Sequence, residues 1–179
     1  MASTQPDWIQ IERATGFPCW RLTDWAYYGP EDDTCNNGGV NCYFKTLDEN
    51  GAFVLSQKLV WSTAEEAAVL ELNQPAGYCY DNQGHEVKYG LAVQMTADSS
   101  FSPGPPPGRG ESGPYSAQIV GNSDIVRGMG LPLRRHVQYT FTFQLQTEGD
   151  EPEPPTPETG EWIIKKQTPT RIVLVKRGE

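Results

Sequence analysis

One stretch, residues 136–146, constrains the fold more than any other part of the sequence; it is His-Val-Gln-Tyr-Thr-Phe-Thr-Phe-Gln-Leu-Gln. Large apolar residues occupy every second position, and polar residues occupy the positions between them. The apolar residues are Val137, Tyr139, Phe141, Phe143 and Leu145. A period of two is typical of a β-strand that buries one face and exposes the other to water. Because a helix would scatter these side chains, the stretch predicts a core strand whose apolar face a second sheet covers.

Turn-forming residues separate several further segments of this kind. The chain has 179 residues, of which 18 are glycine and 15 are proline, and hydrophobic residues make up 37%. This balance favours many turns and an all-β fold in one domain with tails. The intervals of about ten residues predict an antiparallel β-sandwich of about seven to eight strands with an extended C-terminal arm. Besides the core strand, the predicted strands are 40–47, 52–61, 67–72, 86–95 and 115–120.

The first two of these segments are predicted to form a β-hairpin. Residues 48–51, Asp-Glu-Asn-Gly, separate them, and an Asn-Gly pair suits the positive φ of a tight turn. In the second segment Gln57 interrupts an apolar face made by Phe53, Leu55, Leu59 and Trp61. Residues 40–61 are therefore expected to pair with each other within one sheet.

The four cysteines are expected to form disulfides. Their number is even, and no two have the Cys-x-x-Cys spacing of a metal or redox pair. The loop between Cys35 and Cys42 contains Asn-Asn-Gly-Gly and can turn back on itself, which favours that pair and leaves Cys19 with Cys79. The two other sets of pairs, and four free buried thiols, are the alternatives.

Charge and hydropathy restrict the partners and the location. The net charge of −9 argues against nucleic acid, because phosphate binding needs concentrated Lys and Arg. No run of 18 apolar residues occurs, so membrane insertion is not expected. The first eight residues lack the basic and apolar regions of a signal peptide. The predicted disulfides nevertheless favour an extracellular or virion-surface location. Three explanations would account for the missing signal peptide: a virion protein released by lysis, a mature chain whose signal has been removed, or one module of a longer protein.

The C-terminal residues are predicted to be a linker followed by a β segment. Residues 147–160 hold 5 acids and no base, and their proline density favours an extended spacer. Residues 161–179 hold 5 bases and 2 acids and contain two β-prone runs. A hairpin of this size is marginally stable alone, so it is expected to pair with the body or with a neighbouring subunit. The candidate partner-binding residues are Trp162, Ile163, Ile164, Ile172, Val173, Leu174 and Val175.

The sequence thus predicts a chain in four parts. Residues 1–15 are an N-terminal arm, whose Trp8, Ile9 and Ile11 allow it to pair along a sheet edge. Residues 16–146 form the β-sandwich domain. The acidic Pro-rich linker, 147–160, and the basic C-terminal β segment, 161–179, complete the chain.

Three short segments, taken in order, resemble a known module. They are residues 17–22 (Phe-Pro-Cys-Trp-Arg-Leu), 47–51 (Leu-Asp-Glu-Asn-Gly) and 123–132 (Ser-Asp-Ile-Val-Arg-Gly-Met-Gly-Leu-Pro), the last followed by the core strand. Over residues 13–146 the chain resembles a β-sandwich module of bacterial, especially thermophile, surface and cell-wall-associated proteins. That module is similar in plan to transthyretin-like and carbohydrate-binding sandwiches. The resemblance implies an accessory, binding or structural role, and it supplies no catalytic residues.

The sequence offers no catalytic set and no metal site, and no cofactor is expected. Its histidines, His85 and His136, have no second His or Cys at ligand spacing. It contains no phosphate loop, no dinucleotide fingerprint and no Gly-x-Ser-x-Gly elbow. Exposed aromatic rings could stack on sugars, although packing in the core is the alternative role for such residues. The candidates for glycan stacking are Trp25, Tyr27, Tyr28, Tyr78 and Tyr80.

These features together predict a non-enzymatic structural or attachment protein of a surface assembly, either a virion or an extracellular filament. The chain is expected to form a homo-oligomer or a larger assembly, and to associate with itself through its C-terminal strand. A carbohydrate-binding module is the alternative, because the aromatic content and the resemblance favour it. An enzyme is not favoured, since no positive feature supports one.

Overall fold

The computed structural model describes residues 6–29, 40–73, 78–80, 86–104, 110–148, 162–168 and 171–176. The chain divides into two compact units, residues 1–148 and 149–179. The boundary falls two residues beyond the predicted end of the sandwich, so most of the predicted linker belongs to the second unit.

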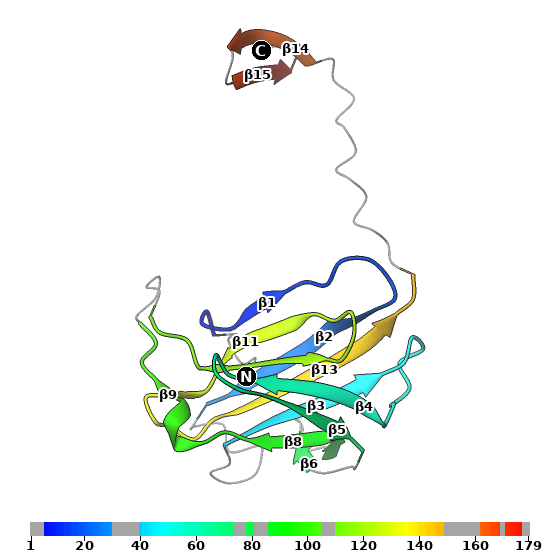
Figure 1. Ribbon diagram of the computed structural model, residues 1–179, viewed down its shortest axis with the longest axis vertical. Coiled ribbons are helices and arrows are strands. Elements are labelled where there is room, and N and C mark those ends of the chain that lie inside the picture. Colours follow the sequence, from blue (N-terminus) through cyan, green and yellow to red (C-terminus); the bar gives the residue numbers. More distant parts are fainter. Residues whose placement is uncertain are drawn as a thin grey trace. The chain divides into compact units, whose positions relative to one another are not determined.

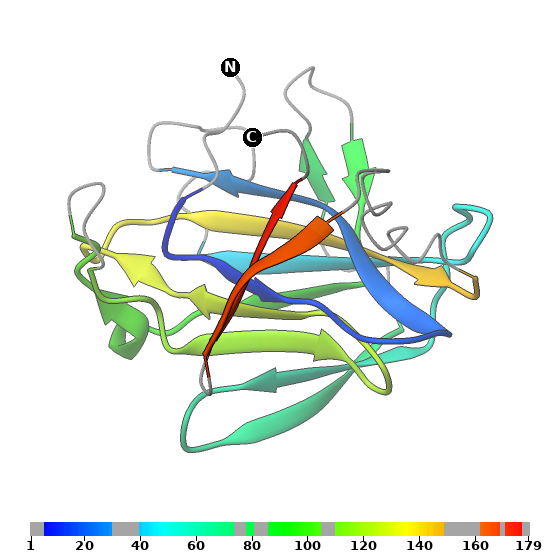
Figure 2. The ribbon, with the colours of Figure 1, turned by 90° about the horizontal axis from the view of Figure 1, so that it is seen from above.

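The first unit is built on two facing β-sheets (Figure 1). One sheet has five strands in the order β1 (Gln10–Glu12), β11 (Ile125–Met129), β10 (Tyr115–Ile119), β4 (Gln57–Ser62) and β5 (Ala67–Leu72). Figure 2 shows these five strands side by side. The other sheet has four strands in the order β2 (Cys19–Tyr28), β13 (Gln138–Gln146), β3 (Asn41–Leu47) and β8 (Leu91–Gln94). The predicted all-β sandwich is confirmed.

Smaller elements complete the described fold. A 3-10 turn, η1 (Ala97–Ser99), leads into β9 (Ser100–Phe101), which runs parallel to β12 (Leu131–Pro132). Two short strands, β6 (Tyr78–Tyr80) and β7 (Glu86–Lys88), pair with each other. The second unit holds β14 (Trp162–Thr168) and β15 (Arg171–Lys176).

β13 is the predicted core strand, and it lies inside the four-stranded sheet. Its neighbours are β2, which runs antiparallel to it, and β3, which runs parallel. Val137, Tyr139, Phe141 and Phe143 are buried, and Leu145 packs against the same core. The predicted alternation is therefore confirmed on the inward face, whereas the parallel pair makes this sheet mixed rather than purely antiparallel.

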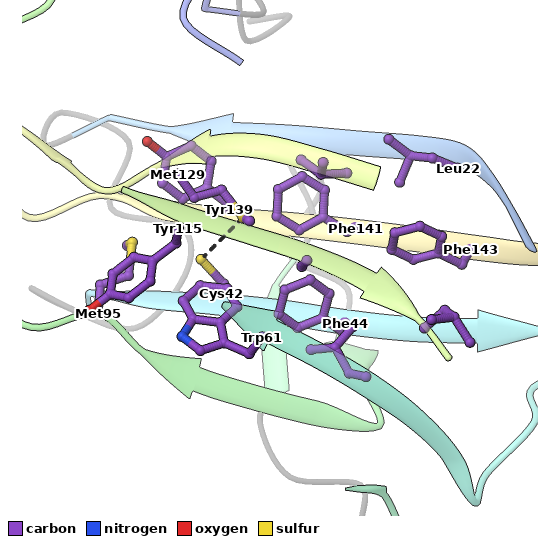
Figure 3. Close-up of a cluster of buried hydrophobic side chains, with 14 of the residues drawn as sticks. Leu22, Cys42, Phe44, Trp61, Met95, Tyr115, Met129, Tyr139, Phe141 and Phe143 are labelled. Atoms are coloured by element: carbon purple, nitrogen blue, oxygen red, sulfur yellow. Dashed lines mark hydrogen bonds between the residues drawn. The ribbon is translucent and has the colours of Figure 1, made fainter. Parts of the chain in front are cut away.

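The core lies between the two sheets and is rich in aromatic rings (Figure 3). Phe141 stacks on Phe44 with ring centroids 5.4 Å apart, and Phe44 meets the edge of Trp61 at 5.9 Å. Trp61 belongs to the five-stranded sheet and continues the contact to Tyr115 at 4.6 Å. Offset and edge-to-face pairs of this kind add about 0.5–1.5 kcal/mol each beyond the burial of their area.

The predicted hairpin of residues 40–61 is wrong beyond its turn. The turn forms, because the Asp48 carboxylate accepts the N–H groups of Asn50 and Ala52, and Leu47 bridges Phe53. The chain then leaves the sheet: β3 belongs to the four-stranded sheet and β4 to the five-stranded one. Ser56, with a φ of 72°, turns the chain between them. The interruption at Gln57 therefore marks a crossing from one sheet to the other.

The outer face of β13 is less exposed to water than its polar residues predict. Gln138 and Thr140 are buried, and they lie on the face opposite Tyr139. A second small cluster, formed by Tyr43 and Tyr89 with ring centroids 5.4 Å apart, covers this region. Its burial raises the pKa of Tyr89 to about 12, although a hydrogen bond with Thr140 opposes the shift. The alternating pattern thus predicted the strand, but it did not predict that Tyr43 and Tyr89 bury part of its polar face.

The other predicted strands are confirmed with local changes. β5 and β10 match segments 67–72 and 115–120, and the N-terminal arm pairs through β1 with β11 and forms the edge of that sheet. The segment 86–95 is divided at Gly90 into β7 and β8. A Cβ atom at Gly90 would lie 3.2 Å from the Cβ of Leu72, so a side chain there would press on the core.

A buried carboxylate joins two distant segments of the first unit. Asp124 is fully buried and accepts four hydrogen bonds. Arg13 and Arg21 donate from 2.6 and 2.9 Å, and the backbone N–H groups of Ala14 and Leu22 donate from 2.8 and 2.9 Å. Burial of a charge is tolerated where partners neutralise it and fill its lone pairs. Asp124 therefore links the N-terminal arm and β2 to the turn before β11 through hydrogen bonds, and we call this set of contacts the Asp124 junction.

The residues beside Asp124 strengthen the same junction. The side-chain amide of Asn122 lies 2.9–3.2 Å from the carbonyl oxygens of Thr15, Gly16 and Pro18. The N–H of Trp20 donates to the carbonyl of Asn122, and the N–H of Asp124 donates to the carbonyl of Trp20. Segments 17–22 and 123–132, two of the three that carry the resemblance noted in the sequence, thus lie next to each other in the structure.

Candidate functional site

The seven predicted partner-binding residues all lie in the two-stranded sheet of the second unit. β14 and β15 pair antiparallel, with Ile163 opposite Val175 and Ile164 opposite Leu174. No further strand joins this sheet in the described part of the chain. In a two-stranded sheet each strand has one outer edge with unpaired N–H and C=O groups. The hairpin therefore offers two edges to which another strand can add.

The two edges of the hairpin differ. The register shifts between Ile164 and Lys166, so β14 carries a bulge with Lys165 at the extra position. A bulge and lysines protect an edge against further pairing. β15 holds four consecutive β-branched or leucine residues between Arg171 and Lys176. β15 is thus the better donor strand.

The predicted glycan-stacking rings do not form one surface among the described residues. Trp25 stacks on Phe141 at 6.3 Å, and Tyr27 contacts Tyr139 at 5.4 Å, so both pack against the core. Tyr28 packs against the separate cluster on the outer face. Tyr78 and Tyr80 belong to β6, and their side chains lie outside the described residues. The contacts of Trp25 and Tyr27 favour the core role that was the alternative for them.

A half-open cavity of about 630 Å³ lies where β8, η1 and the connection from β12 to β13 meet. Its described lining combines apolar side chains with Thr96, Asp98, Arg134 and His136. It contains no Trp, Tyr or Phe among the described residues, so sugar binding by ring stacking would require a different surface.

The turn beside this cavity has a strained backbone. Leu133 and Arg134 have φ values of 53° and 58°, and the N–H of Arg135 donates to the carbonyl of Pro132 at 3.0 Å. A type I′ turn of this kind normally uses Asn or Gly, and left-handed residues of other types cost roughly 1–3 kcal/mol each. The sequence does not reveal this turn because its two central residues, Leu133 and Arg134, are not the Gly, Asn or Asp that usually adopt a positive φ.

The predicted disulfides Cys35–Cys42 and Cys19–Cys79 are not formed in the structure, where Cys19 and Cys42 are free and buried. Cys42 points into the core, and its sulfur lies 3.9 Å from that of Met129 (Figure 3). Cys35 and the side chain of Cys79 lie outside the described residues. Cys42 is a buried thiol and not a disulfide partner because the alternation within β3 places it on the same inward face as Phe44.

Cys42 is accordingly expected to be an unreactive thiol. Complete burial raises its pKa well above the ordinary value, so little thiolate forms at pH 8. Iodoacetamide added to the native protein should leave Cys42 unlabelled, and the same reagent added after unfolding without reductant should label it. Peptide mapping by mass spectrometry measures both states. A Cys42 peptide linked to Cys35 would show instead that the sequence-based pairing was correct.

The described residues hold neither a metal-binding cluster nor a membrane-spanning helix. No group of three or more His, Cys, Asp or Glu side chains is placed to hold a metal ion there. Within the same ranges, no helix has the length and hydropathy needed to cross a membrane.

The described geometry defines an all-β sandwich unit followed by a separate β-hairpin unit. Comparisons with protein-family models, curated proteins and solved structures found no match to this chain.

Proposed function

We propose that the protein is a non-enzymatic structural or attachment protein of a surface assembly, a virion or an extracellular filament, that associates with itself through its C-terminal strand. The observation that carries the proposal is the hairpin of β14 and β15, a unit with no third strand among the described residues. A two-stranded hairpin is marginally stable in water. Pairing with a neighbouring subunit would supply the missing stabilisation.

Charge supports the same proposal. Residues 161–179 hold 5 bases and 2 acids, whereas residues 1–146 hold 16 acids and 9 bases. Opposite charges on the two parts favour association of the hairpin of one copy with the sandwich of another, and they raise the rate of encounter. The effect weakens at high ionic strength because exposed charges are screened.

Removal of residues 149–179 is expected to abolish self-association. The truncated chain keeps the complete sandwich core, which lies within residues 1–148. Sedimentation-velocity ultracentrifugation of the full and the truncated chains measures the change. The full chain should sediment as an oligomer and the truncated chain as a monomer. Equal oligomeric states would count against the proposal.

A carbohydrate-binding module remains the second candidate, and the exposed part of Tyr28 supports it. A glycan array, followed by calorimetry on any sugar that binds, tests it directly. Tyr28→Ala should then reduce affinity, while Tyr27→Phe, which keeps the ring packed against the core, should not. Binding with millimolar or tighter affinity to a defined sugar would favour this candidate.

A further inference from the structure

The two main sheets have four outer strands, and their edges differ in how open they are. These strands are β1 and β5 in one sheet and β2 and β8 in the other. An open edge carries unpaired N–H and C=O groups, and soluble proteins protect such edges by shortness, bulges, charges or cover.

Three of the four edges are protected. β1 has three residues and β8 has four, so neither offers a long ladder. β2 is longer, but a register shift interrupts its ladder with β13, and the outer backbone groups of its first half are occupied. The N–H of Leu22 donates to the Asp124 carboxylate, and its carbonyl accepts from Arg13. The N–H and carbonyl of Trp20 are bonded to the turn 121–124 in the same way.

Among the described residues β5 lacks most of these protections, and Glu71 is its only charged residue. It has six residues, Ala-Ala-Val-Leu-Glu-Leu, and its ladder with β4 runs through all six without a register shift. It contains no proline, lysine or arginine. Its first three residues are exposed, and Val69 retains 60% of its accessible surface. A long, regular and apolar edge of this kind is a site for pairing with another strand.

The hydrogen-bond pattern identifies which groups of β5 face outward. The N–H of Thr63 donates to the carbonyl of Glu66 at 2.8 Å, so this pair is hydrogen-bonded. Hydrogen-bonded pairs recur every second residue in an antiparallel ladder. The backbone groups of residues 68, 70 and 72 therefore face β4, and those of 67, 69 and 71 face away. The carbonyl of Lys58, opposite Glu71, accepts from Val120 on the other side, which agrees with this assignment.

Charge and length favour one occupant of this edge. Glu65 and Glu66 precede β5, and Glu71 lies near its end; all three are exposed. β15 also has six residues and carries Arg171 at one end and Lys176 at the other. In either orientation a paired β15 would bring basic ends close to acidic ones, and opposite charges across strands are favourable.

We propose that the outer edge of β5 is the acceptor site for β15 of a second copy of this chain. The proposal rests on the proposed self-association and names the surface on which it takes place. Each copy then contributes one donor strand and one acceptor edge, which are different surfaces. Contacts of this heterologous kind generate rings or open filaments.

Val69→Pro in the full chain tests the acceptor edge. Proline removes an N–H that faces away from β4, so the β4 ladder keeps its hydrogen bonds, and proline is tolerated on an edge strand. The variant should sediment as a monomer of about 19.9 kDa. Val69→Ala, which keeps the N–H, is the matched control and should assemble like the unchanged chain. Val69→Lys, at the same exposed position, provides a second disruption if the proline variant does not fold.

Mixing two defective chains separates this proposal from the proposed function. Val69→Pro keeps the donor strand, and the chain ending at residue 148 keeps the acceptor edge, so the two should form a one-to-one complex although each alone is monomeric. If Val69→Pro and Val69→Lys still assemble while the truncated chain does not, the acceptor lies elsewhere and the proposed function stands. If the truncated chain assembles unaided, both proposals fail.

Discussion

Replacing Asp124 with alanine is expected to lower the free energy of unfolding by about 3–5 kcal/mol, the range for breaking a buried charged pair. The carboxylate is fully buried, so its removal leaves Arg13, Arg21 and two backbone N–H groups without their acceptor. A buried donor that has no acceptor destabilises the folded state by the full free-energy cost of removing that donor from water. Arg13 is half exposed and can turn to water, so most of the loss comes from Arg21, Ala14 and Leu22.

Urea denaturation followed by tryptophan fluorescence measures this loss, since Trp20 lies beside the junction. Glu12→Ala is the matched control because it removes an ion pair with Arg127 whose two side chains are 63% and 49% exposed. Exposed pairs contribute about 0–1 kcal/mol, so the control should change stability little. Equal effects of the two substitutions would mean that Asp124 does not hold the N-terminal arm and β2 together.

Phe141→Ala is expected to destabilise the sandwich by about 3–5 kcal/mol, the range for removing a buried aromatic ring. Phe141 is fully buried at the centre of β13, and its ring lies between those of Phe44 and Trp25. Alanine would leave a cavity between the two sheets, and the neighbouring rings cannot close it without leaving their own contacts.

Near-ultraviolet circular dichroism and urea denaturation detect this change. Phe53→Ala provides the control, because Phe53 is 38% exposed and lies outside the buried core. Its loss should be clearly smaller. Phe141→Leu, which refills most of the space, should recover much of the stability lost in Phe141→Ala. A small effect of Phe141→Ala would indicate that the two sheets pack less tightly than the ring distances imply.

Prediction from the sequence succeeded where one strand carries its own pattern. The alternation in β13 identified its inward residues, because side chains on a strand point to opposite faces in turn. The C-terminal hairpin was recognisable from its two β-prone runs, and the structure pairs them. The local turn at Asp48 was also predictable, since its hydrogen bonds form within four residues.

Prediction failed where the outcome depended on distant residues. Asp124 stands in a polar turn and looks solvated, but its donors lie more than 100 residues away in the sequence. The position of β5 at the edge of its sheet could not be predicted either, because the segment 67–72 has the same composition whether or not another strand pairs with it. Cys42 was assigned to a disulfide because the number of cysteines is even and the loop after Cys35 can turn back, but in the structure it is a free thiol buried in the core.

The amino-acid sequence was sufficient to predict the β-strands of this chain and the inward side chains of β13, because both follow from the conformation of a few neighbouring residues. The sheet that each strand joins was established only in the folded molecule, as the separation of β3 from β4 shows. An apolar face requires cover but does not specify which strand supplies it. The partners of a strand depend on the paths of distant segments, and among the described residues those paths also left β5 without a second neighbouring strand.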